Sequence, residues 1–485
     1  MCYQLIILLS GFVVPKIILN TYGTGVNGLV SSLSQFIGYA ALLEAGLGGA
    51  AIYALYKPLN ENDDNLISQI IVTTKKLYVK VGNAFILAIV MLGLIYPLVV
   101  KVQGLSYIAT FLLVIMLSGK NVVDFYLFSK YRALLTADNR LYVINIASAV
   151  FQVLNVLIIT TLAMLKINII IVYFSSLLPL MIRSFILWFY VRKKFPNINY
   201  GADSNPALLE NRWSVLFLNL VQAAQGAGPT IIATFLLGLN LVSAYSIYNV
   251  VFSGIIVLLN MIAGSFQSYF GKKISAGVDD VGVRYRYFDL IFTQLVAIVS
   301  AIALLLVVDF IKLYIGPNHA EIYYDYKVGA LMAINLLLVG GRSPGGLLVI
   351  AAGHYKQTRT QSFTQMIFLM VFGVLFSALW GLQGLILGMI ISGLYRWIDL
   401  QIYAPKKILQ VPIAPFLFQA FAMVILFFTI VITAPILFEI NGQTWGQWII
   451  TGIKCALYGL GLSIVITCLT IKIKKIKKEG FSNGY

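Results

Sequence analysis

Residues 328–352 read VGALMAINLLLVGGRSPGGLLVIAA, an apolar run that is interrupted by one arginine, one proline and several glycines. A helix of roughly 20 residues crosses the hydrocarbon core of a bilayer, so this run is long enough to span a membrane. Similar runs recur along the whole chain. The sequence is 60% hydrophobic and 11% charged and has a mean hydropathy of +0.91, which predicts a polytopic membrane protein.

Fourteen stretches are long and apolar enough to be transmembrane segments. All are expected to be helices, because every backbone polar group in a bilayer needs a partner within the protein. The first stretch has no preceding basic region and no small-residue cleavage site, so we interpret it as a retained helix and not as a signal peptide. The predicted spans are residues 3–20, 26–55, 80–100, 107–128, 142–165, 169–190, 214–238, 241–268, 287–311, 328–352, 362–380, 382–404, 413–437 and 447–471.

Lysine and arginine are concentrated on one side of these spans. The connections that follow even-numbered spans, together with the C-terminal tail, hold 24 of the 34 Lys and Arg residues. The opposite connections hold only Lys101, Lys166, Lys312 and Lys327. By the positive-inside rule both termini are predicted to be cytoplasmic. The net charge of +17 is then explained by a basic collar at the membrane surface, without a nucleic-acid partner.

The sequence contains no pattern that is typical of an enzyme. It has no Walker A loop, GxSxG elbow, HExxH motif or paired-carboxylate signature. Its three cysteines and two histidines lack the spacing of a metal or redox site. The external connections are short, which disfavours a membrane glycan polymerase with its active residues in an external loop. The sequence therefore predicts a transporter with no catalytic residues, cofactor or metal.

A weak internal repeat supports transport. Pro15 followed by Gly23 in the first span corresponds to Pro229 followed by Gly238 in the seventh, at an offset of 214 to 215 residues. Two parallel six-helix halves are typical of alternating-access carriers. The repeat predicts an N-terminal lobe, a C-terminal lobe, and a third part with the last two helices and the basic tail, at residues 1–200, 201–405 and 406–485. Since proline kinks helices, the candidate gating residues are Pro15, Pro229 and Pro344.

Charged residues within the spans are the candidate site, because a charge at the helix centre costs about 2.5–3.5 kcal/mol on insertion scales. Arg342 lies near the midplane, and the other deep cations include Arg183, Lys16 and Lys120. A guanidinium can bind a phosphate through two hydrogen bonds. These cations therefore predict a water-filled cationic cavity between the halves, with the glycines and Pro344 loosening the helix beside it. Glu44 is the candidate for proton coupling, by exchange with a cation such as Arg342.

Ion pairing is the structural alternative for these residues. A bridge between Arg342 and Glu44 would give both a purely structural role. Two further pairs are spaced three or four residues apart, so that each can neutralise itself on one helix: Lys120 with Asp124, and Arg396 with Asp399. For the second of these pairs the structural interpretation is favoured.

Three blocks of the sequence are distinctive. They are residues 22–67 (YGTGVNGLVSSLSQFIGYAALLEAGLGGAAIYALYKPLNENDDNLI), 125–146 (FYLFSKYRALLTADNRLYVINI) and 342–358 (RSPGGLLVIAAGHYKQT). Together they resemble the Wzx-type polysaccharide-unit flippases of the multidrug/oligosaccharidyl-lipid/polysaccharide (MOP) exporter superfamily. Members usually begin with a basic cytoplasmic stretch before the first span, which this chain lacks.

The resemblance implies an all-α fold with two MATE-like six-helix bundles in a V-shaped arrangement, plus two C-terminal helices. It implies translocation of undecaprenyl-diphosphate-linked oligosaccharide units to the outer leaflet of the bacterial cytoplasmic membrane, for capsule, O-antigen or exopolysaccharide assembly. The expected partners are this lipid-linked oligosaccharide and membrane lipids, with the polysaccharide polymerase and assembly machinery as further candidates. An ion-coupled multidrug antiporter of the same superfamily is the alternative, which the surplus of deep cations disfavours.

The charge asymmetry generates a prediction about orientation. Single cysteines introduced in the C-terminal tail and at Lys193 should be labelled only from the cytoplasmic side, and one at His319 only from outside. Labelling intact cells and inverted vesicles with a membrane-impermeant maleimide measures this. Labelling of position 319 only from the cytoplasmic side would reverse the predicted topology.

Overall fold

The computed structural model describes residues 2–100, 105–205, 212–276, 280–316, 320–354, 356–440 and 442–482, so His319 lies outside the described residues. All regular secondary structure within these residues is helical, as the sequence predicts. Eleven of the helices are long and apolar enough to cross a membrane, judged by length and composition. The chain divides into two compact units, Met1–Ser246 and Ile247–Tyr485, and the division falls inside α10 (Leu239–Ser265).

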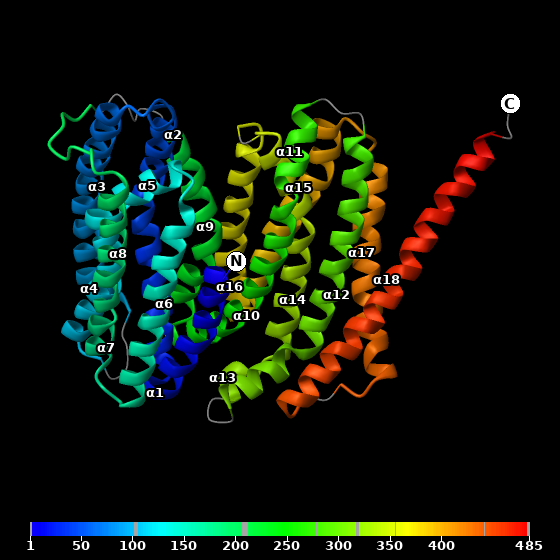
Figure 1. Cartoon of the computed structure of the whole chain (residues 1–485). Helices are drawn as coiled ribbons and strands as arrows, with labels where there is room; N and C mark the ends of the chain where they lie inside the picture. Colours follow the sequence, from blue (N-terminus) through cyan, green and yellow to red (C-terminus); the bar gives the residue numbers. More distant parts are fainter. Residues whose placement is uncertain are drawn as a thin grey trace. The chain divides into compact units, whose positions relative to one another are not determined.

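The first unit runs from blue to green in Figure 1 and ends within α10. Its other elements are α1 (Cys2–Ala41), the short turn η1 (Leu42–Glu44), α2 (Ala45–Glu61), α3 (Asp64–Val99), α4 (Tyr107–Val123), the π-helical turn η2 (Asp124–Phe128), α5 (Ser129–Ala137), α6 (Leu141–Met164), α7 (Ile169–Ser175), α8 (Leu178–Lys194) and α9 (Arg212–Leu236).

The second unit contains the rest of α10 and the remaining helices. These are α11 (Gln267–Ser275), α12 (Val281–Ile315), α13 (Ala320–Tyr323), α14 (Tyr326–Gly341), α15 (Ser343–Ala351), α16 (Arg359–Tyr403), the π-helical turn η5 (Ala404–Leu409), α17 (Ala414–Leu437) and α18 (Trp445–Ser482).

Polar side chains cap several helices where a connection gives way to a span. The Asp63 carboxylate accepts a hydrogen bond from the backbone N–H of Leu66 at the start of α3 (2.9 Å). At the start of α14, the Asp325 carboxylate accepts from the N–H groups of Lys327 (2.8 Å) and Val328 (3.2 Å). The first turn of a helix has N–H groups without a partner in the helix, so these side chains fix where the spans begin.

Glycines with positive φ mark the predicted span boundaries. Helix α1 contains a break at Gly23 (φ 85°), and α16 contains one at Gly381 (φ 59°). This backbone region carries little penalty for glycine, which has no Cβ. The breaks fall where the first predicted span gives way to the second, and the eleventh to the twelfth. These two boundaries are confirmed, whereas the total of fourteen spans stays a prediction.

The backbone also supports the predicted correspondence between Gly23 and Gly238. Gly238 has φ 81° and separates α9 from α10, as Gly23 separates the two halves of α1. Pro15 lies inside α1 and Pro229 inside α9, each before its glycine. Pro344 differs, because it lies in the first turn of α15, directly after a helix break at Arg342.

Two apolar clusters hold the first unit together. One joins α1, α3, α4 and α7 around Leu33, Phe85 and Leu113. The other joins α2, α5, α6 and α8 around Leu55 and Leu134. All five of these side chains are almost completely buried. Polar residues among these helices are therefore held at positions set by a close-packed interior.

A polar seam within the first unit joins α1 to α9 and to the start of α10. Thr24 donates to the Asn240 side-chain oxygen (3.0 Å), Asn27 donates to the Ser243 hydroxyl (2.7 Å), and the Ser32 and Thr234 hydroxyls share a hydrogen bond (2.7 Å). The partners in the first two pairs lie 216 residues apart, close to the offset of the repeat. Positions that are nearly equivalent in the two predicted repeats thus contact each other at this seam.

The seam depends on a close backbone approach at Gly28. A Cβ at this position would lie 1.9 Å from the backbone oxygen of Leu239. We predict that Gly28→Ala lowers the free energy of unfolding by about 1–3 kcal/mol, a range typical of overpacking. Thermal unfolding of the purified protein in detergent measures the effect.

The control for this prediction is Gly38→Ala in the same helix, where a Cβ would meet nothing within 4 Å. That variant should be neutral or slightly stabilised, because alanine favours helix more than glycine does. Equal unfolding temperatures for the two variants would show that the close approach at Gly28 is not required.

Candidate functional site

Four of the cations within the spans lie at similar positions along their own helical segments. Each is about 20–24 Å along its helical segment from the end that is predicted to be external, at about 1.5 Å per residue. They are Lys120 in α4, Arg183 in α8, Arg342 between α14 and α15, and Arg396 in α16. These helices are the fourth, sixth, tenth and twelfth predicted spans. By that numbering the two pairs occupy equivalent spans of the two predicted repeats.

In the first unit, Lys120, Asp124, Phe128, Phe151 and Arg183 form what we call the first cation cluster. The Arg183 guanidinium forms an ion pair with the Asp124 carboxylate and lies 4.0 Å from the ring centre of Phe128. The Phe151 ring centre lies 5.1 Å from this guanidinium and 5.4 Å from the Lys120 ammonium. The cluster thus holds two cations and one carboxylate, which pairs with Arg183, so the exposed Lys120 carries the surplus charge.

The cluster lies where the fourth predicted span departs from regular helix. Asp124 is the first residue of η2, and the hydroxyl of Ser129 donates to its backbone oxygen (2.9 Å). A π-helical turn inserts an extra residue into a helix and occurs frequently at functional sites. The sequence analysis predicted a continuous helix here, because no proline or glycine marks the turn.

In the second unit, Arg342, Arg396 and Asp399 form the second cation cluster. Arg396 donates to the Asp399 carboxylate over 2.6 Å, which confirms the predicted pair. Arg342 lies close enough to Arg396 for electrostatic repulsion. Among the described residues, no carboxylate oxygen lies within 4 Å of the half-buried Arg342 guanidinium. The cluster thus holds two cations and one carboxylate, and the carboxylate pairs with Arg396 alone.

The glycines around Arg342 have a packing role. A Cβ on Gly340 would lie 2.7 Å from Val296 of α12, and a Cβ on Gly341 would lie 3.0 Å from Trp397 of α16. A Cβ on Gly345 would lie 3.0 Å from Leu400 of α16, whereas a Cβ on Gly346 would meet nothing within 4 Å. Three of the four glycines thus have close neighbours, and the expectation that they loosen the helix stays a prediction. They let neighbouring helices approach on both sides of the break that carries Arg342.

Two ion pairs differ from those that the sequence suggested. Asp124 pairs with Arg183 on another helix, and not with Lys120 four residues before it. Glu44 pairs with Arg132 of α5, and not with Arg342. The sequence analysis had assigned Arg132 to a cytoplasmic connection. Because α5 continues the fourth span beyond η2, Arg132 instead reaches the bend at η1 that holds Glu44.

Two further charged residues lie outside both clusters: Lys16, which the sequence analysis named, and Asp289, which it did not. Lys16 is half-buried in α1, which belongs to neither cluster. Asp289 of α12 is 1% exposed, and neither of its carboxylate oxygens has a hydrogen-bond partner among the described residues. An isolated buried charge is costly, so Asp289 is a second acidic candidate for ion coupling. Its position two residues inside the ninth predicted span could have revealed it.

Outside the spans, Arg140 belongs to a surface network of the first unit. Hydrogen bonds to the Asp138 carboxylate and to the Tyr190 hydroxyl (2.7 Å) raise the pKa of the Arg140 guanidinium. Among the described residues, no group of three or more His, Cys, Asp and Glu side chains could hold a metal ion.

Solved structures of transporters share this fold. The lipid II flippase MurJ, in an inward closed conformation, aligns with a TM-score of 0.71 over 95% of this chain and 98% of its own, at 16% identity. An inward-facing multidrug resistance MATE family transporter of the MOP superfamily aligns with a TM-score of 0.69 over 84% and 94%, also at 16% identity. An outward-facing multidrug resistance MATE family transporter of the MOP superfamily aligns with a TM-score of 0.52 over 84% of this chain and 96% of its own, at 14% identity.

The implied MATE-like all-α fold is confirmed by these comparisons. No protein-family model matches the sequence, and no curated protein matches it significantly. At such low identity the likeness shows the fold alone.

The first cation cluster generates a prediction about stability. Asp124→Ala should lower the free energy of unfolding by about 3–5 kcal/mol, because it leaves the buried Arg183 guanidinium uncompensated. Asp124→Ala combined with Arg183→Leu should recover part of this loss. Asp280→Ala, which breaks an exposed pair with Arg284, is the control and should change little. Thermal unfolding in detergent would contradict the interpretation if Asp124→Ala resembled the control.

Proposed function

We propose that the protein is a flippase that moves undecaprenyl-diphosphate-linked oligosaccharide units from the cytoplasmic to the outer leaflet by alternating access. It would act in the bacterial cytoplasmic membrane, with both termini cytoplasmic, and supply units for surface polysaccharide assembly. In this proposal the surplus cation of each cluster, Lys120 or Arg342, binds a phosphate group of the lipid carrier. Arg183 and Arg396 hold the neighbouring carboxylates and contribute positive potential.

The observation that carries the proposal is the unneutralised Arg342 at a helix break. A purely structural arginine at mid-depth is expected to bring a carboxylate partner. The nearby carboxylate, Asp399, is already paired with Arg396. A guanidinium that is held by packed glycines and free of a competing acid suits a phosphate, which it can bind through two hydrogen bonds. The fold shared with a lipid II flippase supports a lipid-linked substrate.

Alternating access is supported by the polar seam. Hydrogen bonds between hydroxyl and amide side chains are modest in net energy, about 0.5–1.5 kcal/mol each, so such a seam can open and close reversibly. It links the helix that carries Pro15 to the helix that carries Pro229, the two prolines that were predicted to act in gating.

An ion-coupled multidrug antiporter is the second candidate, since MATE multidrug transporters share the fold. The cation clusters argue against it, because surplus positive charge disfavours a cationic drug. Ion coupling itself is compatible with both candidates. Glu44 stays the predicted coupling residue, with Arg132 in place of Arg342 as the cation that it would exchange against a proton.

We predict that Arg342→Ala reduces surface polysaccharide by about ten- to hundredfold, which corresponds to the loss of charge-assisted hydrogen bonds of about 1.5–3 kcal/mol. Arg342→Lys should be partly active, because it keeps the charge and loses the planar fork. Quantification of surface polysaccharide in a strain that expresses each variant measures the effect.

The amount of folded protein in the membrane must be measured alongside. Lys407→Ala, which removes an exposed cation from η5, is the matched control and should be fully active. If Arg342→Ala loses polysaccharide only in proportion to its loss of folded protein, Arg342 is structural and the proposed phosphate contact is wrong.

A further inference from the structure

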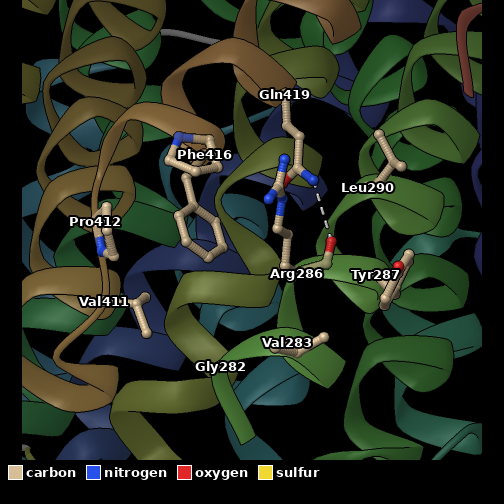
Figure 2. A pocket seen from close by; sticks show the side chains of 10 residues that line it. Gly282, Val283, Arg286, Tyr287, Leu290, Val411, Pro412, Phe416 and Gln419 are labelled. Carbon is tan, nitrogen blue, oxygen red and sulfur yellow. Dashed lines mark hydrogen bonds between the residues drawn. The ribbon is translucent and has the colours of Figure 1, made fainter. Parts of the chain in front are cut away.

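A cavity of about 260 Å³ lies in the second unit, between the start of α12 and the segment that leads into α17 (Figure 2). Its apolar wall includes Val283, Leu290, Val411 and Phe416. Val411 closes one side tightly, since a Cβ on Gly282 would lie 2.7 Å from it. The cavity belongs to neither cation cluster, and the proposed transport function does not use it.

One cation faces this cavity. Arg286 of α12 lines it, as does Gln419 of α17 (Figure 2). Among the described residues, no carboxylate oxygen lies within 4 Å of Arg286, although Asp289 follows three residues later in the same helix. Arg284 differs, because it pairs with Asp280 over 2.6 Å. Arg286 is therefore available to an anion.

Gln419 supplies a second polar group. It is 2% exposed, and its amide nitrogen donates to the backbone oxygen of Arg286 (3.2 Å, Figure 2). That bond fixes the orientation of the amide, because a flipped amide would place two oxygens together. Its side-chain oxygen is buried and has no hydrogen-bond donor among the described residues. An unsatisfied buried acceptor is rare, and a donor group on a ligand in the adjoining cavity would satisfy it once the surrounding side chains shift to admit that group.

The surroundings favour a membrane lipid. Val283, Tyr287 and Ile291 recur every four residues along α12 and are 51%, 53% and 69% exposed, so they form one apolar stripe that begins at the cavity. This part of α12 lies at the end that is predicted to be cytoplasmic. A cation at that end is ordinary under the positive-inside rule. That rule does not require the other features beside this cation, namely the cavity, the buried amide oxygen without a donor, and the apolar stripe.

We propose that this cavity binds the headgroup of an anionic phospholipid that carries a hydroxyl group, such as phosphatidylglycerol. The phosphate contacts the Arg286 guanidinium, a headgroup hydroxyl donates to the Gln419 side-chain oxygen, and an acyl chain follows the stripe past Tyr287. A headgroup ammonium could also donate to Gln419, but Arg286 would repel it. The site is a binding site for membrane lipid and is independent of the transported substrate.

Native mass spectrometry of the full-length protein with added phosphatidylglycerol, phosphatidic acid or phosphatidylethanolamine tests this proposal. The wild type should retain phosphatidylglycerol in preference to the other two. Arg286→Gln should weaken its retention by about tenfold, as expected for one charge-assisted contact. Gln419→Leu should remove the preference for phosphatidylglycerol over phosphatidic acid, because the leucine has no acceptor for the hydroxyl.

Arg284→Gln is the matched control, since it removes a paired cation two residues away, and it should retain the lipid like the wild type. All variants should keep the unfolding temperature of the wild type within a few degrees. Equal retention by Arg286→Gln and the wild type would overturn the proposal, as would equal losses in Arg286→Gln and Arg284→Gln. Displacement of phosphatidylglycerol by equimolar undecaprenyl phosphate would identify a site for the substrate carrier and overturn the assignment to a phospholipid.

Discussion

A cation at the centre of a membrane needs an anionic partner, water or a bound anionic substrate, because the hydrocarbon core does not solvate charge. This constraint shapes both units of the protein. Each unit holds two cations on spans that the predicted repeat makes equivalent, and supplies one nearby carboxylate, Asp124 or Asp399. The pairing of one cation in each cluster lowers the cost of burial while one positive charge is retained. That surplus charge links the helical packing to the proposed recognition of phosphate.

Close helix packing is what presents the surplus cation in the second unit. Gly340, Gly341 and Gly345 allow neighbouring helices to approach on both sides of Arg342, and the helix breaks between them. The backbone N–H of Arg342 still donates to Leu338 (3.1 Å) and its backbone oxygen still accepts from Gly346 (3.0 Å), so the break is a local one, at which Pro344 has no N–H to donate. In the first unit, the π-helical turn that begins at Asp124 provides a different irregularity at a comparable place.

Local features were predictable from the sequence, and long-range pairings were not. The helix breaks at Gly23 and Gly381 and the pair formed by Arg396 and Asp399 depend on residues within a few positions of each other, so pattern and spacing revealed them. The partner of Arg183 is 59 residues away and that of Glu44 is 88 residues away. Those contacts depend on which helices pack together and on a π-helical turn without a sequence signal. Spacing along one helix therefore suggested the wrong partner for Asp124.

The central claim is that the surplus cations bind the phosphate groups of a lipid carrier. Binding of undecaprenyl diphosphate and of uncharged undecaprenol to the purified protein tests it most directly. The account predicts that the diphosphate binds much more tightly than the alcohol, and that replacing both Lys120 and Arg342 by glutamine abolishes this difference without lowering the unfolding temperature. Replacement of Lys57, an exposed cation in α2, should leave the difference intact. An undiminished preference for the diphosphate in the double variant would contradict the account.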